Sequence, residues 1–193
     1  MNLPLRVGYE GIALLARGLA SIAPSTGSKL LDTFASRRGV RARFAAFRRA
    51  PGRPLLWMHA PSVGEGLQAR PVLELARERA REWQLAYTYF SPSAERFAAG
   101  LNVDFRDVLP FDATGDARAA IRALDPTALV FSKLDVWPTL AREASNRGVG
   151  LGLVSATLSP DRRGGAASPR RCSVTRMRDS TASERSAPRM RSD

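Results

Sequence analysis

A carboxylate at the start of a helix is the feature of this sequence best suited to chemistry. The segment from His59 to Glu65, read as HAPSVGE, follows a short apolar run and opens a helical pattern. In an open parallel sheet the ligand crevice lies outside the carboxyl ends of the strands, so Glu65 stands where a strand leads into that crevice. The residues from Ser62 to Glu65 also fit a capping box, in which both side chains bond backbone N–H groups. The sequence leaves both interpretations open.

Polar residues also follow the later apolar runs of the chain. Ser91-Pro92-Ser93 comes after one run, and Ser93 could either cap the next helix or face a ligand. Lys133 and Asp135 come after another run. Because the carboxyl ends of parallel strands meet at one edge of the sheet, we expect these residues on the same edge as Glu65.

The elements that must position these residues alternate between strands and helices. The expected strands are Leu55–His59, Leu85–Phe90, Asp107–Leu109, Ala128–Ser132 and Val149–Val154, and the expected helices are Glu65–Glu82, Ser93–Ala99, Asp116–Leu124 and Trp137–Arg147. Gly100 and Gly148 stand where left-handed helix caps favour glycine, and Pro71 should kink the first helix. Short strands alternating with helices predict an α/β fold with a Rossmann-like parallel sheet.

These segments resemble the Kdo transferases, bacterial inner-membrane glycosyltransferases that add 3-deoxy-manno-octulosonate to lipid A precursors. The stretch LLWMHAPSVGEG is similar to the family's HAxSVGE segment, and LPFD and KLDVWP are similar to its L-P-x-D and E-T-E-L-W-P segments. The resemblance implies the N-terminal, acceptor-side half of a GT-B type glycosyltransferase, with the carboxylate matching Glu65 as the general base. It implies acceptor-binding roles for Ser62, Gly64, Ser93, Lys133 and Asp135.

The resemblance also implies a reaction and its partners. The family's inverting transfer moves Kdo from CMP-Kdo to a lipid A precursor and requires no metal and no cofactor. The family's second Rossmann-like domain, which holds the donor, is expected to be missing, so we expect this chain to be inactive by itself. Lys133 replaces an acid of the family pattern, and Asp135 shortens another by one methylene group. A positive rim of Arg53, Arg70 and Lys133 could meet acceptor phosphates.

Two other functions fit the same residues. One is a non-catalytic fragment that keeps the fold and binds a membrane surface. The other is the acceptor domain of a different GT-B glycosyltransferase, for example one of peptidoglycan or glycolipid synthesis. The pairing of SVGE with Trp-Pro favours the Kdo transferases over this last class.

The net charge of +12 is concentrated at the two ends of the chain. Residues 1–49 hold nine basic and two acidic residues, and residues 162–193 hold nine basic and three acidic residues. Residues 50–161 are nearly neutral, with twelve basic and thirteen acidic residues. Basic ends with few interleaved aromatic residues attract phosphate without stacking on bases, so no specific nucleic-acid partner is expected. One cysteine and one histidine leave no disulfide and no cysteine or histidine metal cluster to build.

The charge pattern predicts three regions. Residues 1–49 are expected to form a basic, amphipathic membrane-anchor region, in which Phe44 and Phe47 lie beside arginines on an anionic surface. The alternative is an ordinary solvated helix that packs its apolar side on the domain. Residues 50–161 are expected to form the Rossmann-like domain. Residues 162–193 carry few apolar side chains and are expected to form a disordered basic tail, which a frameshift would explain. The predicted location is the cytoplasmic face of the inner membrane, with peripheral or N-terminal attachment.

Overall fold

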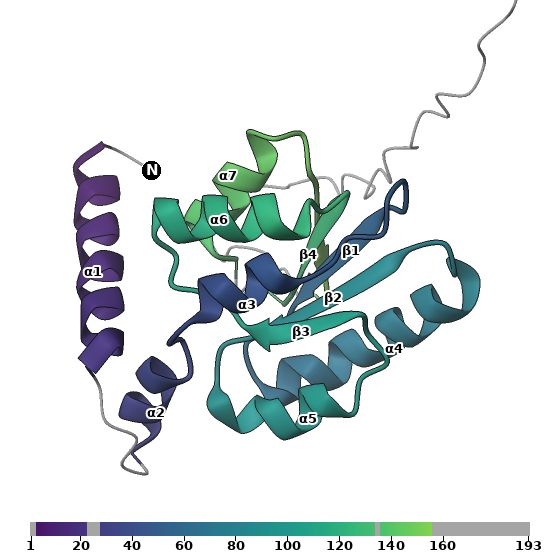
Figure 1. Cartoon of the computed structure of the whole chain (residues 1–193), viewed down its shortest axis with the longest axis horizontal. Helices are drawn as coiled ribbons and strands as arrows, with labels where there is room; N and C mark the ends of the chain where they lie inside the picture. Colours follow the sequence, from purple (N-terminus) through teal and green to yellow (C-terminus); the bar gives the residue numbers. More distant parts are fainter. Residues whose placement is uncertain (1–2, 23–27, 134–135, 156–193) are drawn as a thin grey trace, which may run out of the picture. The chain divides into compact units, whose positions relative to one another are not determined.

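Five parallel strands lie at the centre of the structure, a computed structural model that describes residues 3–22, 28–133 and 136–155 (Figure 1). The strands are β1 (Leu55–His59), β2 (Gln84–Tyr89), β3 (Phe105–Val108), β4 (Ala128–Ser132) and β5 (Gly150–Val154). The helices are α1 (Leu3–Ile22), α2 (Lys29–Ala35), α3 (Val40–Ala46), α4 (Val63–Arg79), α5 (Glu95–Ala99), α6 (Thr114–Leu124) and α7 (Pro138–Ser145), with a 3-10 turn η1 (Pro92–Ala94). The predicted α/β fold with a Rossmann-like parallel sheet is confirmed.

The strand order of the sheet is β3-β2-β1-β4-β5. Helices α4 and α5 cover one face of the sheet, and α3, α6 and α7 cover the other (Figure 1). The chain builds the sheet outward from β1 to β3 on one side, and then crosses to β4 on the other side of β1. The point where the order reverses therefore lies between β1 and β4, and in open α/β sheets this is the place where ligands bind.

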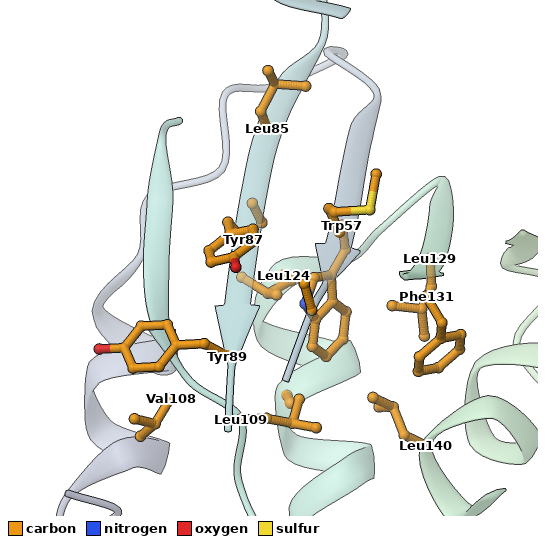
Figure 2. Packing of buried hydrophobic residues seen from close by; sticks show 14 of the residues in the cluster. Trp57, Leu85, Tyr87, Tyr89, Val108, Leu109, Leu124, Leu129, Phe131 and Leu140 are labelled. Atoms are coloured by element: carbon orange, nitrogen blue, oxygen red, sulfur yellow. The ribbon is translucent and has the colours of Figure 1, made fainter. Parts of the chain in front are cut away.

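Large apolar and aromatic side chains from both faces of the sheet form the core (Figure 2). Trp57, Tyr87 and Phe131 are among the largest side chains that are fully buried. Full burial of an aromatic or large aliphatic side chain contributes about 1.5–3 kcal/mol each, and strands covered on both faces need such side chains on both. This core holds the carboxyl ends of β1, β2 and β4 in a fixed arrangement.

Helix α3 is part of this folded domain. The side chain of Phe44 is 1% exposed, and its ring lies 4.8 Å from the ring of Phe105. The ring of Phe47 packs on the same residue at 5.1 Å, and Arg43 forms hydrogen bonds of 2.7 and 2.8 Å with Asp107. Of the two interpretations of this stretch, the membrane-facing one is therefore wrong for Phe44 and Phe47, and packing on the domain is confirmed, because both rings lie against Phe105 of β3.

Helix α1 contacts the domain through polar side chains. Tyr9 donates a hydrogen bond of 2.8 Å to Asp112, and Glu10 accepts bonds of 2.7 and 2.8 Å from the backbone and hydroxyl group of Thr114. Several large apolar side chains of α1 remain exposed, namely Val7, Ile12, Leu14 and Leu15. None of the helices that the structure describes is long and apolar enough to cross a bilayer. Helix α1 thus presents an apolar surface away from the contacts that hold it.

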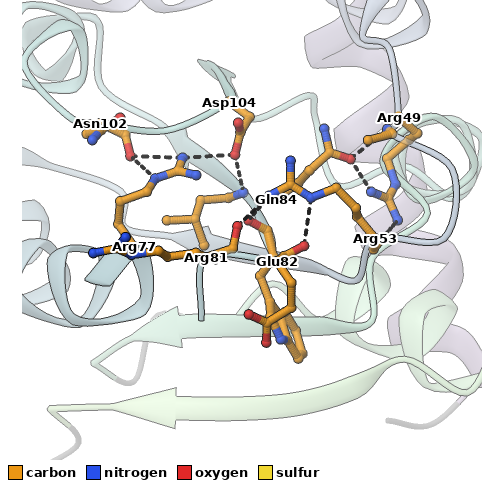
Figure 3. A network of polar contacts seen from close by, with 11 residues as sticks. Arg49, Arg53, Arg77, Arg81, Glu82, Gln84, Asn102 and Asp104 are labelled. Atoms are coloured by element: carbon orange, nitrogen blue, oxygen red, sulfur yellow. Dashed lines mark hydrogen bonds and ion pairs between the residues drawn. The ribbon is translucent and has the colours of Figure 1, made fainter. Parts of the chain in front are cut away.

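Arginines tie together the loops at the amino ends of the strands (Figure 3). Arg53 donates hydrogen bonds of 2.7 and 2.6 Å to the backbone oxygens of Glu82 and Arg81. Arg70 forms an exposed ion pair within α4. The predicted positive rim of Arg53, Arg70 and Lys133 is therefore wrong for Arg53, which lies at the amino edge of the sheet, whereas Lys133 follows the carboxyl end of β4.

The two glycines that were predicted to be left-handed helix caps differ in conformation. Gly148, after α7, has a φ of +75°, as predicted for a left-handed residue. Gly100, after α5, has a φ of −85° and a right-handed conformation, so that prediction is wrong. Helix α4 continues through Pro71 to Arg79. The missing N–H of Pro71 removes one backbone bond, and the turns on either side carry the helix across it.

Candidate active site

The candidate site lies between the carboxyl ends of β1 and β4. Glu65 is in the first turn of α4, which directly follows β1, and Lys133 directly follows β4. The ammonium group of Lys133 donates a hydrogen bond of 3.1 Å to Oε1 of Glu65. Ser132 donates a second bond of 3.1 Å to the backbone oxygen of Glu65. The topology of the sheet thus brings together two residues that are 68 positions apart in sequence.

The capping box expected as the alternative for Ser62 and Glu65 is not formed. Ser62 has the extended backbone of an N-cap residue, but its side chain makes no capping hydrogen bond. Its hydroxyl group donates instead to Oε2 of Glu65. The carboxylate therefore has one partner on each oxygen, and each oxygen retains a lone pair that can accept a further proton or hydrogen bond.

The surroundings of Glu65 keep its side chain ionised. The hydrogen bond from Ser62 lowers the pKa of Glu65 below its usual value, and the bond and positive charge of Lys133 act in the same direction, while partial burial opposes them. The Glu65 side chain is 20% exposed and that of Lys133 is 45% exposed. A carboxylate that is charged at neutral pH and open to solvent meets the first requirement for a general base.

Lys133 adopts an unusual backbone conformation to reach this position. Its φ is +61°, and its backbone N–H donates a bond of 2.7 Å to the oxygen of Val154. A residue with a β-carbon pays roughly 1 kcal/mol for this left-handed conformation. The strain lies at the strand end that faces Glu65, which is where parallel sheets carry functional residues.

Two neighbouring glycines near Glu65 have different roles. A β-carbon on Gly66 would lie 2.5 Å from a ring carbon of Phe97 and 2.8 Å from the hydroxyl oxygen of Tyr87. Gly66 is therefore required for the packing of α4 on the sheet, a role that the sequence analysis missed. A β-carbon on Gly64 would meet only the Ser62 oxygen at 3.8 Å, an ordinary contact. Packing does not require glycine at position 64, so a ligand contact there stays a prediction.

The other predicted acceptor-binding residues have separate outcomes. The Oγ atom of Ser93 lies 2.8 Å from that of Ser91, and η1 and α5 begin at Pro92 and Glu95. The prediction that Ser93 caps the next helix is therefore wrong, and its contact with an acceptor stays a prediction. Asp135 lies outside the described residues.

His59 lies beneath the candidate site and is fully buried. Its Nδ1 atom is 3.0 Å from Oγ1 of Thr88, which also accepts a bond of 2.8 Å from the indole of Trp57. Its ring packs edge-on against Trp137 with 5.8 Å between centroids. Burial lowers the pKa of His59 to about 3, so the imidazole is neutral under ordinary conditions. The interpretation of His59 as a packed, hydrogen-bonded residue fits this environment.

Asp112 has a positioning role that the sequence analysis did not find. It accepts hydrogen bonds of 2.9 and 2.8 Å from the backbone N–H groups of Thr139 and Leu140, the first turn of α7. Burial raises the pKa of Asp112, and these bonds oppose the rise. The N-cap residue of α7 is Trp137, whose side chain has no oxygen that could accept a bond from these N–H groups. A tryptophan at a helix start therefore indicates that a residue elsewhere in the chain must supply the acceptor. Asp112 thereby fixes the first turn of α7.

Fold and site together define a Rossmann-like α/β domain of the kind that forms the N-terminal half of a GT-B glycosyltransferase, with one ionised carboxylate at the switch point of its sheet. The comparisons with known proteins agree. Residues 38–180 match the family described as 3-deoxy-D-manno-octulosonic-acid transferase (kdotransferase). The chain belongs to this Kdo transferase family. The matched residues run past position 161, the predicted end of the domain.

Individual relatives carry the same name. A 3-deoxy-D-manno-octulosonic acid transferase of Chlamydia trachomatis is 31% identical over 134 residues, covering 68% of this chain and 30% of the relative. One of Bordetella pertussis is 34% identical over 127 residues, covering 61% of this chain and 29% of the relative. One of Aquifex aeolicus is 33% identical over 88 residues, covering 44% of this chain and 24% of the relative. The match thus spans between 24% and 30% of the length of these curated relatives.

Proposed function

We propose that this chain is the acceptor-side domain of an enzyme that transfers Kdo from CMP-Kdo to a lipid A precursor during assembly of the lipopolysaccharide core. The observation that carries the proposal is the ionised carboxylate of Glu65 at the switch point of the sheet, in a chain that belongs to the Kdo transferase family. The donor nucleotide would be held by the part of the protein that lies outside this chain.

Glu65 acts as the general base in this proposal. One carboxylate oxygen accepts the proton of an acceptor hydroxyl group while the oxygen of that group bonds to the anomeric carbon of Kdo. The bond between this carbon and the phosphate oxygen of CMP breaks, and CMP leaves with the electron pair. Attack from the side opposite CMP inverts the anomeric centre.

Ser62 and Lys133 tune the base and orient it. Their hydrogen bonds fix the two carboxylate oxygens and keep the group charged, at the cost of weaker basicity. Because the Lys133 side chain is 45% exposed, an anionic acceptor can draw its ammonium group away. The pKa of Glu65 would then rise as the acceptor binds, which strengthens the base at the moment it is needed.

Attachment to the cytoplasmic face of the inner membrane is the second part of the proposal. The apolar side chains of α1 are exposed, and Ile12 and Leu15 are 69% and 71% exposed. Leu30 of α2 is 72% exposed. Because α3 belongs to the domain, the proposed anchor is restricted to α1 and α2. An amphipathic helix held to the domain by Tyr9 and Glu10 can bury its apolar side in the interfacial layer of a bilayer.

A chimaera tests the proposed reaction. Residues 1–155 are joined to the C-terminal remainder of the Bordetella pertussis relative, and Kdo transfer from CMP-Kdo to a lipid A precursor is measured. We expect transfer by this chimaera, and a loss of at least about a hundredfold in the Glu65→Gln variant, the usual scale for a general base. A chimaera with a native circular dichroism spectrum and no transfer would favour the non-catalytic alternative.

A further inference from the structure

Arg37 is a buried cation without an acidic partner. Its side chain is 4% exposed, and among the described residues no carboxylate forms an ion pair with it. Its guanidinium donates bonds of 2.6 and 3.1 Å to the backbone oxygens of Thr33 and Phe90, and it lies 4.1 and 5.0 Å from the ring centroids of Phe90 and Phe111. Its Nε atom is buried and has no hydrogen-bond partner.

This arrangement leaves the positive charge of Arg37 without a directly bonded carboxylate, and Asp107 acts on it only through its charge. Burial lowers the pKa of Arg37 to about 10, so the group remains protonated at neutral pH. Aromatic faces and carbonyl dipoles stabilise a guanidinium only in part, and buried charges in proteins are ordinarily paired or bind a counter-ion. An anionic ligand beside the guanidinium would supply the missing charge.

A cavity of about 560 Å³ adjoins this cation. Its lining comes from α1, the turn between α2 and α3, the start of α3, the segment after β3, and α6, and the charged lining residues are Arg17, Arg37, Arg38, Arg41 and Asp116. We call this cavity the arginine pocket. Among the described residues that line the pocket, Asp116 is the one acid, and it is already paired with Arg41. The pocket therefore keeps a net positive charge from three elements of the fold.

We infer that the arginine pocket binds a phosphate group. Guanidinium groups present planar pairs of N–H donors that match phosphate oxygens. Because several such groups surround one cavity, a tetrahedral phosphate fits it better than a planar carboxylate ligand does. Arg17 lies on the same helix as the exposed side chains of Ile12 and Leu15. A phosphate carried by a lipid would place its charge in the pocket and its chains beside this apolar surface.

The pocket also adjoins the edge of the sheet that carries Glu65. Phe90, which accepts a bond from Arg37, donates its own N–H to the backbone oxygen of Pro61 at 3.0 Å. Pro61 directly precedes Ser62, the partner of Glu65. A phosphate in the pocket would hold the rest of a phosphorylated lipid near the candidate base. In this respect the inference rests on the proposed function, and it replaces the rim of Arg53, Arg70 and Lys133 as the phosphate site.

Vesicle co-sedimentation with the full chain tests this inference. Vesicles of phosphatidylcholine with and without phosphatidic acid are compared, at a salt concentration that screens charges beyond about 8 Å. Arg37→Lys keeps the charge and loses the planar donors, and Arg17→Gln changes an exposed side chain of the pocket that folding does not need. Arg79→Gln is the matched control, because Arg79 is exposed in the last turn of α4, on the other face of the sheet.

We expect each pocket variant to bind phosphatidic acid vesicles about tenfold more weakly, the effect of losing one charge-assisted hydrogen bond, while Arg79→Gln binds as the unaltered chain does. Competition by inorganic phosphate separates two sources of the ligand: full competition indicates free phosphate, and weak competition indicates a lipid-borne phosphate. Equal losses in all three variants, or none in the pocket variants, would overturn the inference. Vesicle binding is measured without transfer, so a failure of Glu65 as the base would leave this result standing.

Discussion

The only histidine of the chain makes the stability of the fold depend on pH in a way that can be calculated. His59 is fully buried, and burial lowers its pKa from 6.5 to about 3. In the unfolded chain the imidazole takes up a proton below pH 6.5, whereas in the folded chain it stays neutral until about pH 3. The unfolded state then binds more protons, so lowering the pH through this window destabilises the fold.

The size of the effect follows from the two pKa values of His59. Between the two pKa values the free energy of unfolding falls by about 1.36 kcal/mol for each pH unit, so it should fall by about 2 kcal/mol between about pH 7 and pH 5, almost all of it below pH 6.5. This loss is a large part of the stability of a small domain. Asn at position 59 would remove this pH-dependent loss of stability, because its amide does not titrate and can keep a hydrogen bond with Thr88.

Urea unfolding of the full chain and of the His59→Asn variant measures this effect. The difference in pH dependence between the two proteins isolates His59 from the carboxylates, which both proteins share. We expect the unaltered chain to lose about 2 kcal/mol more than the variant between about pH 7 and pH 5. Equal losses in the two proteins would show that the imidazole gains its proton in the folded state, and that the burial argument is wrong.

Two further predictions concern the start of α4. Gly66→Ala should lower the free energy of unfolding by about 1–3 kcal/mol, because its methyl group would lie 2.5 Å from an aromatic carbon of α5, whereas Gly64→Ala should leave stability unchanged or raise it by up to about 1 kcal/mol. Thermal unfolding of both variants checks the pair, and similar losses in both would refute it. Ser62→Ala should raise the pKa of Glu65 more than Lys133→Met does, since the Ser62 bond is the largest cause of its lowering. Carbon-13 NMR titration of the carboxyl group decides this, and the opposite order would show that Lys133 dominates.

The sheet was predictable from sequence because each strand is a short apolar run bounded by turn residues. The bounds of Leu55–His59 and Ala128–Ser132 match the prediction without change. The sign of φ at Gly100 was not predictable from its place after a helix, because a right-handed residue also ends the short helix α5. The N–H of Gly100 bonds to the backbone oxygens of Phe97 and Ala98, which closes the last turn of α5 without a left-handed residue.

The candidate site was predictable only in part. Glu65 could be found from its place after a strand, but the ion pair with Lys133 depends on strand order, which the sequence does not state. Arg37 and Asp112 were missed as functional residues because their roles come from contacts across the fold. Arg37 meets Phe90 53 positions away, and Asp112 meets α7 27 positions away. A basic residue before a helix and an acid after a strand are individually unremarkable in sequence.

The pH dependence of transfer by the chimaera of residues 1–155 with the Bordetella pertussis remainder tests the central claim most directly. Because the pKa of Glu65 is lowered, kcat/KM of the unaltered chimaera should stay constant on the acid side until the pH falls below the ordinary glutamate value of 4.5. The Glu65→Gln chimaera should transfer at least about a hundredfold more slowly and lack this acid limb. If the Gln variant matched the unaltered chimaera in rate and pH profile, Glu65 would not be the base.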